Sequence, residues 1–480
     1  MEGISFEWAS VSTEATLAVF AALILCMSAV ASDRGAKWIS LFAMFGFVAA
    51  LAVEVFAPFG ASSFGGALGG KSVFGVFAIA CALLSALMGF QYFAKGARGR
   101  NEFFSILMIC AAALILFVRS NNLMFAFVSL ECATICLYIM AAWSRDVPAS
   151  VEASVKYLVI AGVSGAMFLL GIAFVYGASL AVGRNLLVFE NFTLGLVHPM
   201  FLTGIIFVAG SALFKVAAFP FQFWSPDVYQ GSPTPVSAFF AVVSKAAGIV
   251  FVGKICMSLD FASIGLADLQ NKAVLAMSIV AGATIVVGNL GGITQVNVKR
   301  LTAFSGISNA GYMLVLVCAV LKYASLADFF TPVLYFYLAA YMFANYAVFF
   351  VVNGFEGCDD SDQTLADYRG LARKSPVMSG TLIVNLSSLA GIPPTAGFFG
   401  KVLVIVTAWN AQLYWLTGIM IAGSVVSIYY YFAWLRSSLD SADRGERKLD
   451  ANPLFYPTMV ALSVATVALG LGGILYFYGI

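Results

Sequence analysis

The sequence predicts an all-α polytopic membrane protein, and its composition is the first observation that predicts this. Hydrophobic residues make up 62% of the 480 residues, charged residues make up only 10%, and the mean hydropathy is +0.97. Soluble domains contain about 45–50% apolar and about 25% charged residues. Apolar segments follow one another along the chain with no soluble domain between them. The net charge of +2 provides no basic surface of the kind that binds nucleic acid.

The lengths of the apolar segments are the second observation. Because a membrane-spanning helix needs about 20 predominantly apolar residues, we expect about 14 transmembrane helices. The segment 376–408 is too long for a simple span, and it contains the sequence GIPPTAG. The expected spans lie near 14–32, 37–58, 72–94, 102–118, 122–143, 154–180, 200–220, 234–257, 272–290, 298–321, 328–353, 376–408, 411–435 and 453–479.

The distribution of lysine and arginine over the loops is the third observation. With the N-terminus outside, the inner loops hold 15 of the 25 basic residues and the outer segments hold 6. This bias predicts that both termini lie on the outer face of the membrane. Lys299 and Arg300 are counted with an inner loop. They lie at the end of an expected helix, from which their long side chains can extend to the membrane interface. Four lysines belong to no loop, namely Lys156, Lys215, Lys245 and Lys401.

Two apolar segments have the pattern of broken helices. The first follows Lys215 and contains Pro220, and the second contains Pro393 and Pro394 ahead of Lys401. The two breaks lie five spans apart, and this odd number predicts two five-helix repeats of opposite orientation. Interrupted segments at matching positions are typical of inverted-repeat transporters. We therefore expect an N-terminal three-helix segment (1–100), a first repeat (101–260), a second repeat (261–436) and a C-terminal helix (437–480).

Ionisable residues in apolar surroundings are the candidates for chemistry. A charged side chain inside a membrane span is costly, so it is a functional-site hypothesis by default. Burial disfavours the charged form of an amine, which lets such a lysine exchange protons near neutral pH. The candidates for a proton relay are Glu131, Lys156, Lys215, Lys245 and Lys401, with water and the hydroxyl groups of Ser211, Tyr229, Ser244 and Thr395 as bridges.

The acidic member of this set suggests an ion pair. Glu131 lies in the fifth span and Lys156 near the start of the sixth. Antiparallel neighbours bring these two positions to comparable depth, although Glu152 lies one turn before Lys156 and competes for it. The alternative interpretation is that a lysine near a span end, such as Lys156, extends to the interface, and that Glu131 only packs.

Redox cofactors and metal ions are not expected in this chain. His198 is the only histidine, which excludes bis-histidine ligation of haem. The eight cysteines form no CxxC pair. Cys132 and Cys136 share a helix face but have no histidine nearby, so we interpret them as small buried hydrophobic residues. The acidic residues of the longest polar loop, 353–375, are interpreted as a solvated surface rather than a docking site.

Several long motifs together resemble the antiporter-like subunits of respiratory complex I, over roughly residues 100–435 and in the same order. They are SLECATICLY around Glu131, FKVAAFPFQFWSPDVYQGSPTP from Phe214, KRLTAFSGISNAGYML from Lys299 and LAGIPPTAGFFGKV before Leu403. Within this family the chain is most similar to subunit N of the bacterial NADH-quinone oxidoreductases. It ends after the last expected span, without the long lateral helix of subunit L, and it has Lys401 where subunit M typically has glutamate.

The resemblance implies an inverted-repeat proton channel with a Glu131–Lys156 pair, a gating Lys215, a central Lys245 and an exit-side Lys401. It implies that NADH, FMN, iron–sulfur clusters and quinone belong to other chains of a parent complex. It also implies other complex I membrane subunits as partners and the inner (plasma) membrane of a bacterium as the location. One departure is Gln222, which stands where the family often has a histidine, so a histidine relay is absent here or replaced by water.

Three functions compete at this point. The first is a proton-translocating subunit, without a redox centre of its own, of a quinone oxidoreductase. The second is a cation/proton antiporter, or an antiporter subunit, of the same fold. The third is a purely structural membrane subunit. An antiporter transports when it is reconstituted alone, whereas a complex subunit copurifies with chains that bind NADH and quinone.

Overall fold

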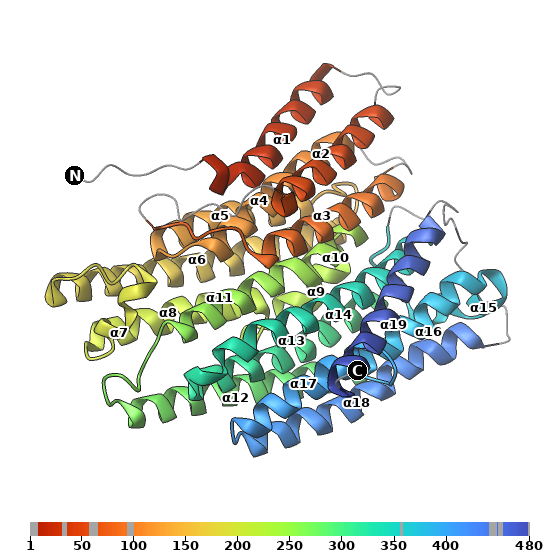
Figure 1. The fold of residues 1–480 in the computed structure, drawn as a ribbon. Helices are drawn as coiled ribbons and strands as arrows, with labels where there is room; N and C mark the ends of the chain where they lie inside the picture. Colours follow the sequence, from red (N-terminus) through yellow and green to blue (C-terminus); the bar gives the residue numbers. More distant parts are fainter. Residues whose placement is uncertain are drawn as a thin grey trace. The chain divides into compact units, whose positions relative to one another are not determined.

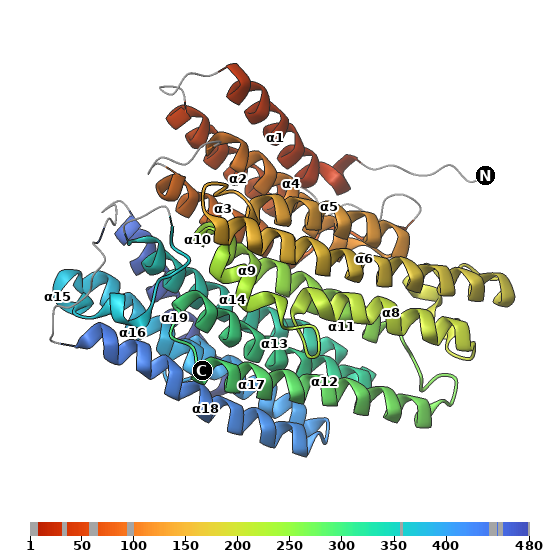
Figure 2. The same ribbon diagram turned by 180° about the vertical axis from the view of Figure 1, so that it is seen from behind.

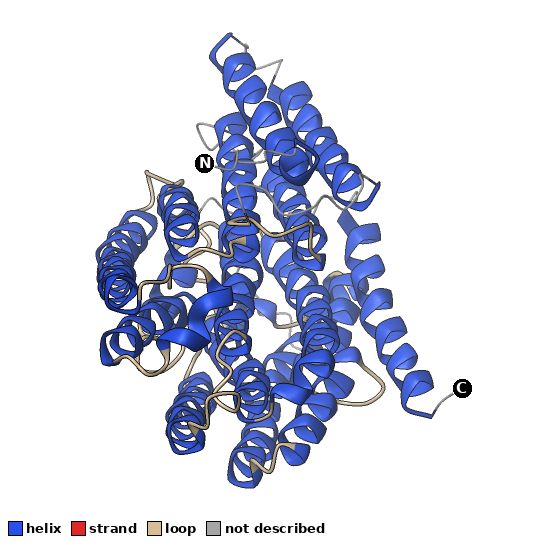
Figure 3. Cartoon of the chain, turned by 60° about the vertical axis from the view of Figure 1, so that its left-hand side comes forward, coloured by secondary structure: helices blue, strands red, loops and turns tan. Residues whose placement is uncertain are grey.

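The computed structural model describes residues 8–30, 36–56, 66–93, 100–355, 359–440, 449 and 455–478. Helices and loops, but no strands, make up this part of the chain (Figure 3). Thirteen of its helices are long and apolar enough to cross a membrane, and two shorter apolar helices cover Pro376–Ala390 and Ala396–Asn410. The predicted all-α polytopic fold is confirmed. The count differs from the expected fourteen because the segment 376–408 consists of two half-length helices.

The α-helices, labelled in Figure 1, are α1 (Ser12–Val30), α2 (Ala36–Phe56), α3 (Val73–Tyr92), α4 (Arg100–Arg119), α5 (Leu123–Ala141), α6 (Pro148–Val182), α7 (Phe192–Gly195), α8 (Pro199–Val216), α9 (Trp224–Gly231), α10 (Thr234–Phe239), α11 (Lys245–Met257), α12 (Ala267–Ile293), α13 (Val298–Lys322), α14 (Ala327–Asn353), α15 (Leu371–Lys374), α16 (Pro376–Ala390), α17 (Ala396–Asn410), α18 (Tyr414–Leu439) and α19 (Tyr456–Tyr478). Short 3-10 turns cover Trp8–Val11, Phe189–Asn191, Ala324–Leu326 and Leu365–Tyr368.

The chain forms two compact units. The first unit contains Met1–Lys215 and Val243–Ala267, and the second contains Val216–Val242 and Asp268–Ile480. In the first unit, α1 packs against α2 and α4, and α5 packs against α4 and α6 (Figure 1). In the second unit, α14 packs against α16, α17 and α19, while α13 packs against α9 and α17 (Figure 2). The two inverted repeats stay a prediction.

The first helix break follows α8. This helix ends at Val216, and the next residue, Ala217, has a φ of +60°. An L-residue in this left-handed conformation costs roughly 1–2 kcal/mol, so the surrounding structure must hold it. Pro220 then prevents the helix from continuing, because it has no N–H group and disfavours a helical conformation at Phe219. The peptide bond between Phe219 and Pro220 is cis.

The second break separates α16 from α17. Gly391 caps α16 in the left-handed conformation with a φ of +86°, and the amides of Gly391 and Ile392 donate to the carbonyl of Ser387. Glycine adopts this conformation without the steric cost that other residues bear. Pro393 and Pro394, joined by a cis peptide bond, follow and end the helix. Both predicted breaks are therefore present in the structure.

A third irregularity was not predicted. Residues Phe240–Ser244 form a π-helical turn directly before Lys245, within the candidate span Thr234–Met257. Single π-helical turns inside α-helices are frequent at functional sites. This span and Val298–Lys322 are each 94% buried over their most apolar windows, more than any other candidate span among the described residues.

Some of the basic residues that the sequence assigns to the inner loops lie outside the described residues. These are Arg34, Lys95, Arg98, Arg444, Arg447 and Lys448.

Candidate functional site

Lys215 is the centre of a polar cluster in the first unit. It lies in the last turn of α8 and is only 2% exposed. Its ammonium group donates hydrogen bonds to Thr134 Oγ1 on α5 (2.8 Å) and to the Tyr157 hydroxyl on α6 (2.9 Å). The same nitrogen lies 5.6 Å from the centre of the Tyr157 ring. Three helices therefore supply the surroundings of one buried amine.

Glu131 belongs to the same cluster. It lies one helical turn before Thr134 on α5, so both side chains lie on one face of that helix. The Glu131 carboxylate and the Lys215 ammonium group are within electrostatic range of each other. A Cβ atom added to Gly165 on α6 would lie 2.6 Å from Glu131 Oε1. The glycine therefore leaves the room that the carboxylate occupies between α5 and α6.

Lys156 forms an ion pair with Glu152, the competing partner that the sequence identified. The Lys156 nitrogen lies 2.8 Å from Glu152 Oε1, one helical turn earlier on α6, and the two side chains are 42% and 66% exposed. An exposed pair of this kind contributes little to stability, about 0.3–0.5 kcal/mol. The pairing of Lys156 with Glu131 stays a prediction. The next residue, Tyr157, is the one that contacts Lys215.

Lys245 lies at the first position of α11, directly after the π-helical turn. Its side chain is 1% exposed and is among the most buried charged groups in the described part of the chain. The hydroxyl oxygen of the preceding Ser244 is buried and has no hydrogen-bond partner among the described residues. A buried hydroxyl without a protein partner is costly, and a water molecule is the usual way to satisfy it.

Lys401 occupies the second break. It lies on α17, is 5% exposed, and donates hydrogen bonds to the carbonyl oxygens of Leu389 (2.9 Å) and Ala390 (3.0 Å). These are the last two carbonyls of α16, which have no partner within their own helix. They also form the negative end of the helix dipole, so a cation is stabilised there. The nitrogen lies 5.2 Å from the centre of the Tyr312 ring.

A small cavity adjoins Lys401. Its volume of about 10 Å³ is close to the space that one water molecule needs. Its polar lining comes from Lys401, Asn309, Tyr337, Tyr341 and Ser388. The Tyr341 hydroxyl is buried and has no hydrogen-bond partner among the described residues. The cavity therefore offers a water molecule several polar neighbours next to the buried amine.

Two hydrogen-bonded chains extend through the second unit near this cavity. In the first chain, Tyr337 donates to Asn309 Oδ1 (2.8 Å). Asn309 Nδ2 donates to the carbonyl of Ser305 (2.8 Å) and also to the Ser305 hydroxyl (3.5 Å), and this hydroxyl contacts the Tyr431 hydroxyl.

In the second chain, Tyr430 donates to Asn289 Oδ1 (3.2 Å), and Asn289 donates to the Tyr312 hydroxyl (3.3 Å). The ring of Tyr312 is the one that lies beside Lys401. A hydroxyl group donates and accepts through the same oxygen, whereas an amide donates through its nitrogen and accepts through its oxygen. Proton transfer past Asn289 and Asn309 therefore requires water.

Two of the four bridging hydroxyls predicted from the sequence form hydrogen bonds to groups other than the lysines. Ser211 pairs with Ser164 (2.9 Å), and Thr395 donates to the carbonyl of Ile392 within its own loop (2.7 Å). Thr134 and Tyr157 were not identified from the sequence as the hydrogen-bond partners of Lys215. Thr134 had a detectable signal, because it lies three residues after Glu131 on the same helix face.

Comparisons with known proteins agree with one another. The family model described as NADH:quinone oxidoreductase/Mrp antiporter, TM, matches residues 120–427. The chain is 35% identical to NADH-quinone oxidoreductase subunit N 1 of Opitutus terrae, over 98% of this chain and 95% of that protein. Among solved structures it is similar to a chain of respiratory complex I from Thermus thermophilus, with 30% identity, a TM-score of 0.77, and coverage of 96% and 98% of the two chains.

A second solved structure supports the fold alone. A chain of the Mrp complex from Dietzia has a TM-score of 0.77 to this chain, with 18% identity and coverage of 96% of this chain and 95% of that one.

Proposed function

The chain belongs to the NADH:quinone oxidoreductase/Mrp antiporter transmembrane family, and we propose that it is the antiporter-like, proton-translocating subunit N of the membrane arm of an NADH-quinone oxidoreductase. The observation that carries this proposal is the burial of three lysines in apolar helices. Lys215 and Lys245 lie in candidate membrane spans, and Lys401 lies in the half-length helix α17. Buried amines at membrane depth are costly to keep, which supports a role in moving charge.

In this proposal Lys215 gates the relay. Its ammonium group donates to the hydroxyls of Thr134 and Tyr157. The Thr134 hydroxyl donates its own proton to the carbonyl of Leu130 (2.7 Å), so the Tyr157 hydroxyl is the one whose proton can be passed on. The Glu131 carboxylate stabilises the charged form of Lys215, so a change in the position or charge of Glu131 favours proton release. Lys156, with its alternative partner Glu152, is the residue whose pairing with Glu131 controls that change.

Lys401 acts on the exit side, and Lys245 lies between the two breaks in sequence. An ammonium group has three donors, and two of those of Lys401 bond the carbonyls of Leu389 and Ala390. Carbonyls only accept hydrogen bonds, so they hold the charged form without conducting the proton. The third donor is the one available to a water molecule in the adjoining cavity.

The energy for transport comes from other chains. Moving one charge against 100 mV costs about 2.3 kcal/mol, which this subunit has no chemistry to supply. NADH, FMN, iron–sulfur clusters and quinone are assigned to the parent complex, and other membrane subunits are the partners. We place the chain in the inner (plasma) membrane of a bacterium with both termini on the outer face, as the distribution of basic residues supports.

A cation/proton antiporter is the second candidate, because the matching family includes Mrp antiporters. Reconstitution discriminates the two. The subunit alone in liposomes should not exchange sodium for protons, whereas the intact complex should couple quinone reduction to proton transport. In that complex, replacement of Lys215 by alanine should stop the transport that this subunit carries. Exchange by the isolated chain would favour the antiporter.

A further inference from the structure

A buried charge cluster holds the junction between α9 and α10 in the second unit. The chain between these helices consists of Ser232 and Pro233. Proline has no side-chain acceptor, so as the N-cap residue it leaves the first amides of the following helix without a local cap. The candidate span that begins here, Thr234–Met257, carries Lys245 eleven residues further on. The angle and register of this start therefore depend on contacts from elsewhere.

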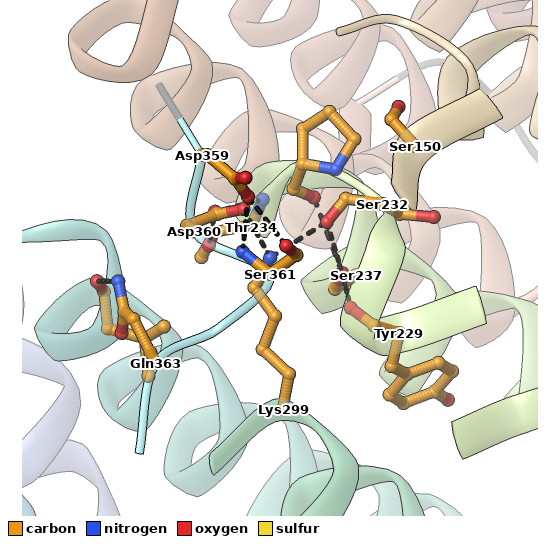
Figure 4. A network of polar contacts seen from close by, with 12 residues as sticks. Ser150, Tyr229, Ser232, Thr234, Ser237, Lys299, Asp359, Asp360, Ser361 and Gln363 are labelled. Carbon is orange, nitrogen blue, oxygen red and sulfur yellow. Dashed lines mark hydrogen bonds and ion pairs between the residues drawn. The ribbon is translucent and has the colours of Figure 1, made fainter. Parts of the chain in front are cut away.

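Asp360 supplies the missing cap (Figure 4). Its side chain is 8% exposed. One carboxylate oxygen, Oδ2, accepts hydrogen bonds from the backbone amide of Thr234 (3.0 Å) and from the Thr234 hydroxyl. The other, Oδ1, lies 2.6 Å from the ammonium nitrogen of Lys299. Both oxygens are occupied, so this acidic residue is not part of a solvated surface, and the interpretation of the loop from sequence was wrong at this position.

Lys299 closes the cluster from the other side. Its side chain is fully buried, and it also donates to the carbonyl of Ser232 (2.8 Å). The next residue on α13, Arg300, pairs with Asp227 (2.5 Å) and donates to Gln230 Oε1 (3.0 Å), both on α9. Thus Lys299 and Arg300 hold one side of the junction, and Asp360 holds the other. Lys299 does not extend to the interface, contrary to the interpretation from sequence.

The loop that carries Asp360 is itself fixed to the start of α13. The amide of Val298 donates to the carbonyl of Gln363 (3.0 Å), and Asn297 Nδ2 donates to the carbonyl of Ser361 (2.7 Å). Asn297 in turn caps α13 through the amides of Lys299 and Arg300. The loop that holds the carboxylate is therefore tied to the start of α13 by hydrogen bonds.

The later turns of α13 carry Asn309, which lines the Lys401 cavity, and Tyr312, whose ring centre lies 5.2 Å from the Lys401 nitrogen. One helix thus connects the cluster to the surroundings of Lys401. The same cluster holds the first residue of the span that carries Lys245.

We propose that Asp360 is a positioning residue, which together with Lys299 fixes the Ser232–Pro233 junction and so couples the span that carries Lys245 to α13. It transfers no proton itself. This inference depends on the proposed function, because its consequence is a change in proton transport. Loosening the junction alters the alignment of the relay, while the redox reaction on other chains continues.

The test is Asp360→Asn in the intact complex. Asparagine replaces one acceptor oxygen by an NH2 donor, and this donor must face either Thr234 or Lys299, which are both donors. We expect a lower number of protons transported per electron at an unchanged rate of NADH oxidation. Hydrogen exchange of the peptide 227–239 should also become faster. The matched control is Asp268→Asn, which breaks the exposed Asp268–Lys272 pair (2.7 Å) and should change neither quantity.

Normal proton transport and normal exchange in Asp360→Asn would overturn the inference. If this variant does not assemble, Thr234→Val is used instead, because it removes only the hydroxyl donor to Asp360. We expect it to lower the proton-to-electron ratio as well. An unchanged ratio in Thr234→Val would also overturn the inference. Lys215→Ala separates the two levels of the proposal. If Lys215→Ala loses transport while Asp360→Asn keeps it, only the positioning role is refuted. If Lys215→Ala keeps normal transport, the proposed function is refuted.

Discussion

The Lys401 ammonium group donates a 2.9 Å hydrogen bond to the carbonyl oxygen of Leu389, twelve residues earlier in the chain. This bond joins the two halves of a broken helix, because Leu389 lies in the last turn of α16 and Lys401 in α17. The cation satisfies a carbonyl that the break leaves without a partner. The helix break and the buried amine thus stabilise each other: the amine satisfies carbonyls that the break exposes, and these carbonyls stabilise the buried positive charge.

Gly391→Ala tests this contact between the helix break and Lys401. The glycine has a φ of +86°, and an added Cβ atom would lie 3.0 Å from Lys401 Cδ and 3.3 Å from its nitrogen. The left-handed conformation alone costs an alanine roughly 1–2 kcal/mol. We expect a lower thermal unfolding temperature of the detergent-solubilised complex and reduced proton transport.

The control for that variant is Gly380→Ala on α16, where an added Cβ meets no atom within 4 Å. Alanine favours a helix over glycine by about 1 kcal/mol, so this variant should be as stable as the parent or more so. Equal behaviour of the two variants would contradict the role of Gly391.

Thr134→Val removes one of the two hydroxyls that bond Lys215, with little change in shape. A hydrogen bond to a charged group is worth about 1.5–3 kcal/mol, so the charged form of the buried amine loses support. We expect slower proton transport by the intact complex, measured with a pH-sensitive dye in vesicles. Thr134→Ser keeps the hydroxyl and should restore transport. A valine variant as active as the serine variant would show that this contact does not serve the relay.

Lys215→Ala removes the gating amine itself. We expect coupled proton transport to fall by at least about tenfold, the effect of about 1.4 kcal/mol on the limiting step. The matched control is Lys272→Ala, because Lys272 is a lysine on α12 whose side chain is 71% exposed. Both variants should assemble, as checked by native mass spectrometry. Transport that survives both Lys215→Ala and Glu131→Ala would favour a purely structural subunit.

The breaks and the buried amines were predictable from sequence because their signals are local. Pro220, Pro393 and Gly391 restrict the backbone wherever they occur, and a lysine within an apolar run is conspicuous on its own. The π-helical turn before Lys245 was not predictable, because no residue type marks it.

The partners of the buried charges also required the structure. Tyr157 reaches Lys215 from another helix, 58 residues away in sequence. Asp360 lies in a run of acidic residues that is typical of a solvated loop. It is nevertheless buried, because it contacts Lys299 and Thr234, which lie 61 and 126 residues away in the sequence. Sequence patterns report a residue's neighbours along the chain, whereas the cost of a buried charge depends on its neighbours in space.

Gly165→Ala tests whether the Glu131 carboxylate needs its place against α6. The added Cβ would lie 2.6 Å from Glu131 Oε1, closer than atoms in contact approach, so the carboxylate must move. Because this carboxylate interacts electrostatically with Lys215, its displacement should weaken support for the charged amine and slow proton transport. Gly162→Ala, one turn earlier on α6, introduces the same methyl group where no atom lies within 4 Å and should leave transport unchanged. If both variants transport protons like the parent protein, the position of Glu131 does not limit the relay, and Lys215 is controlled by its hydroxyl partners instead.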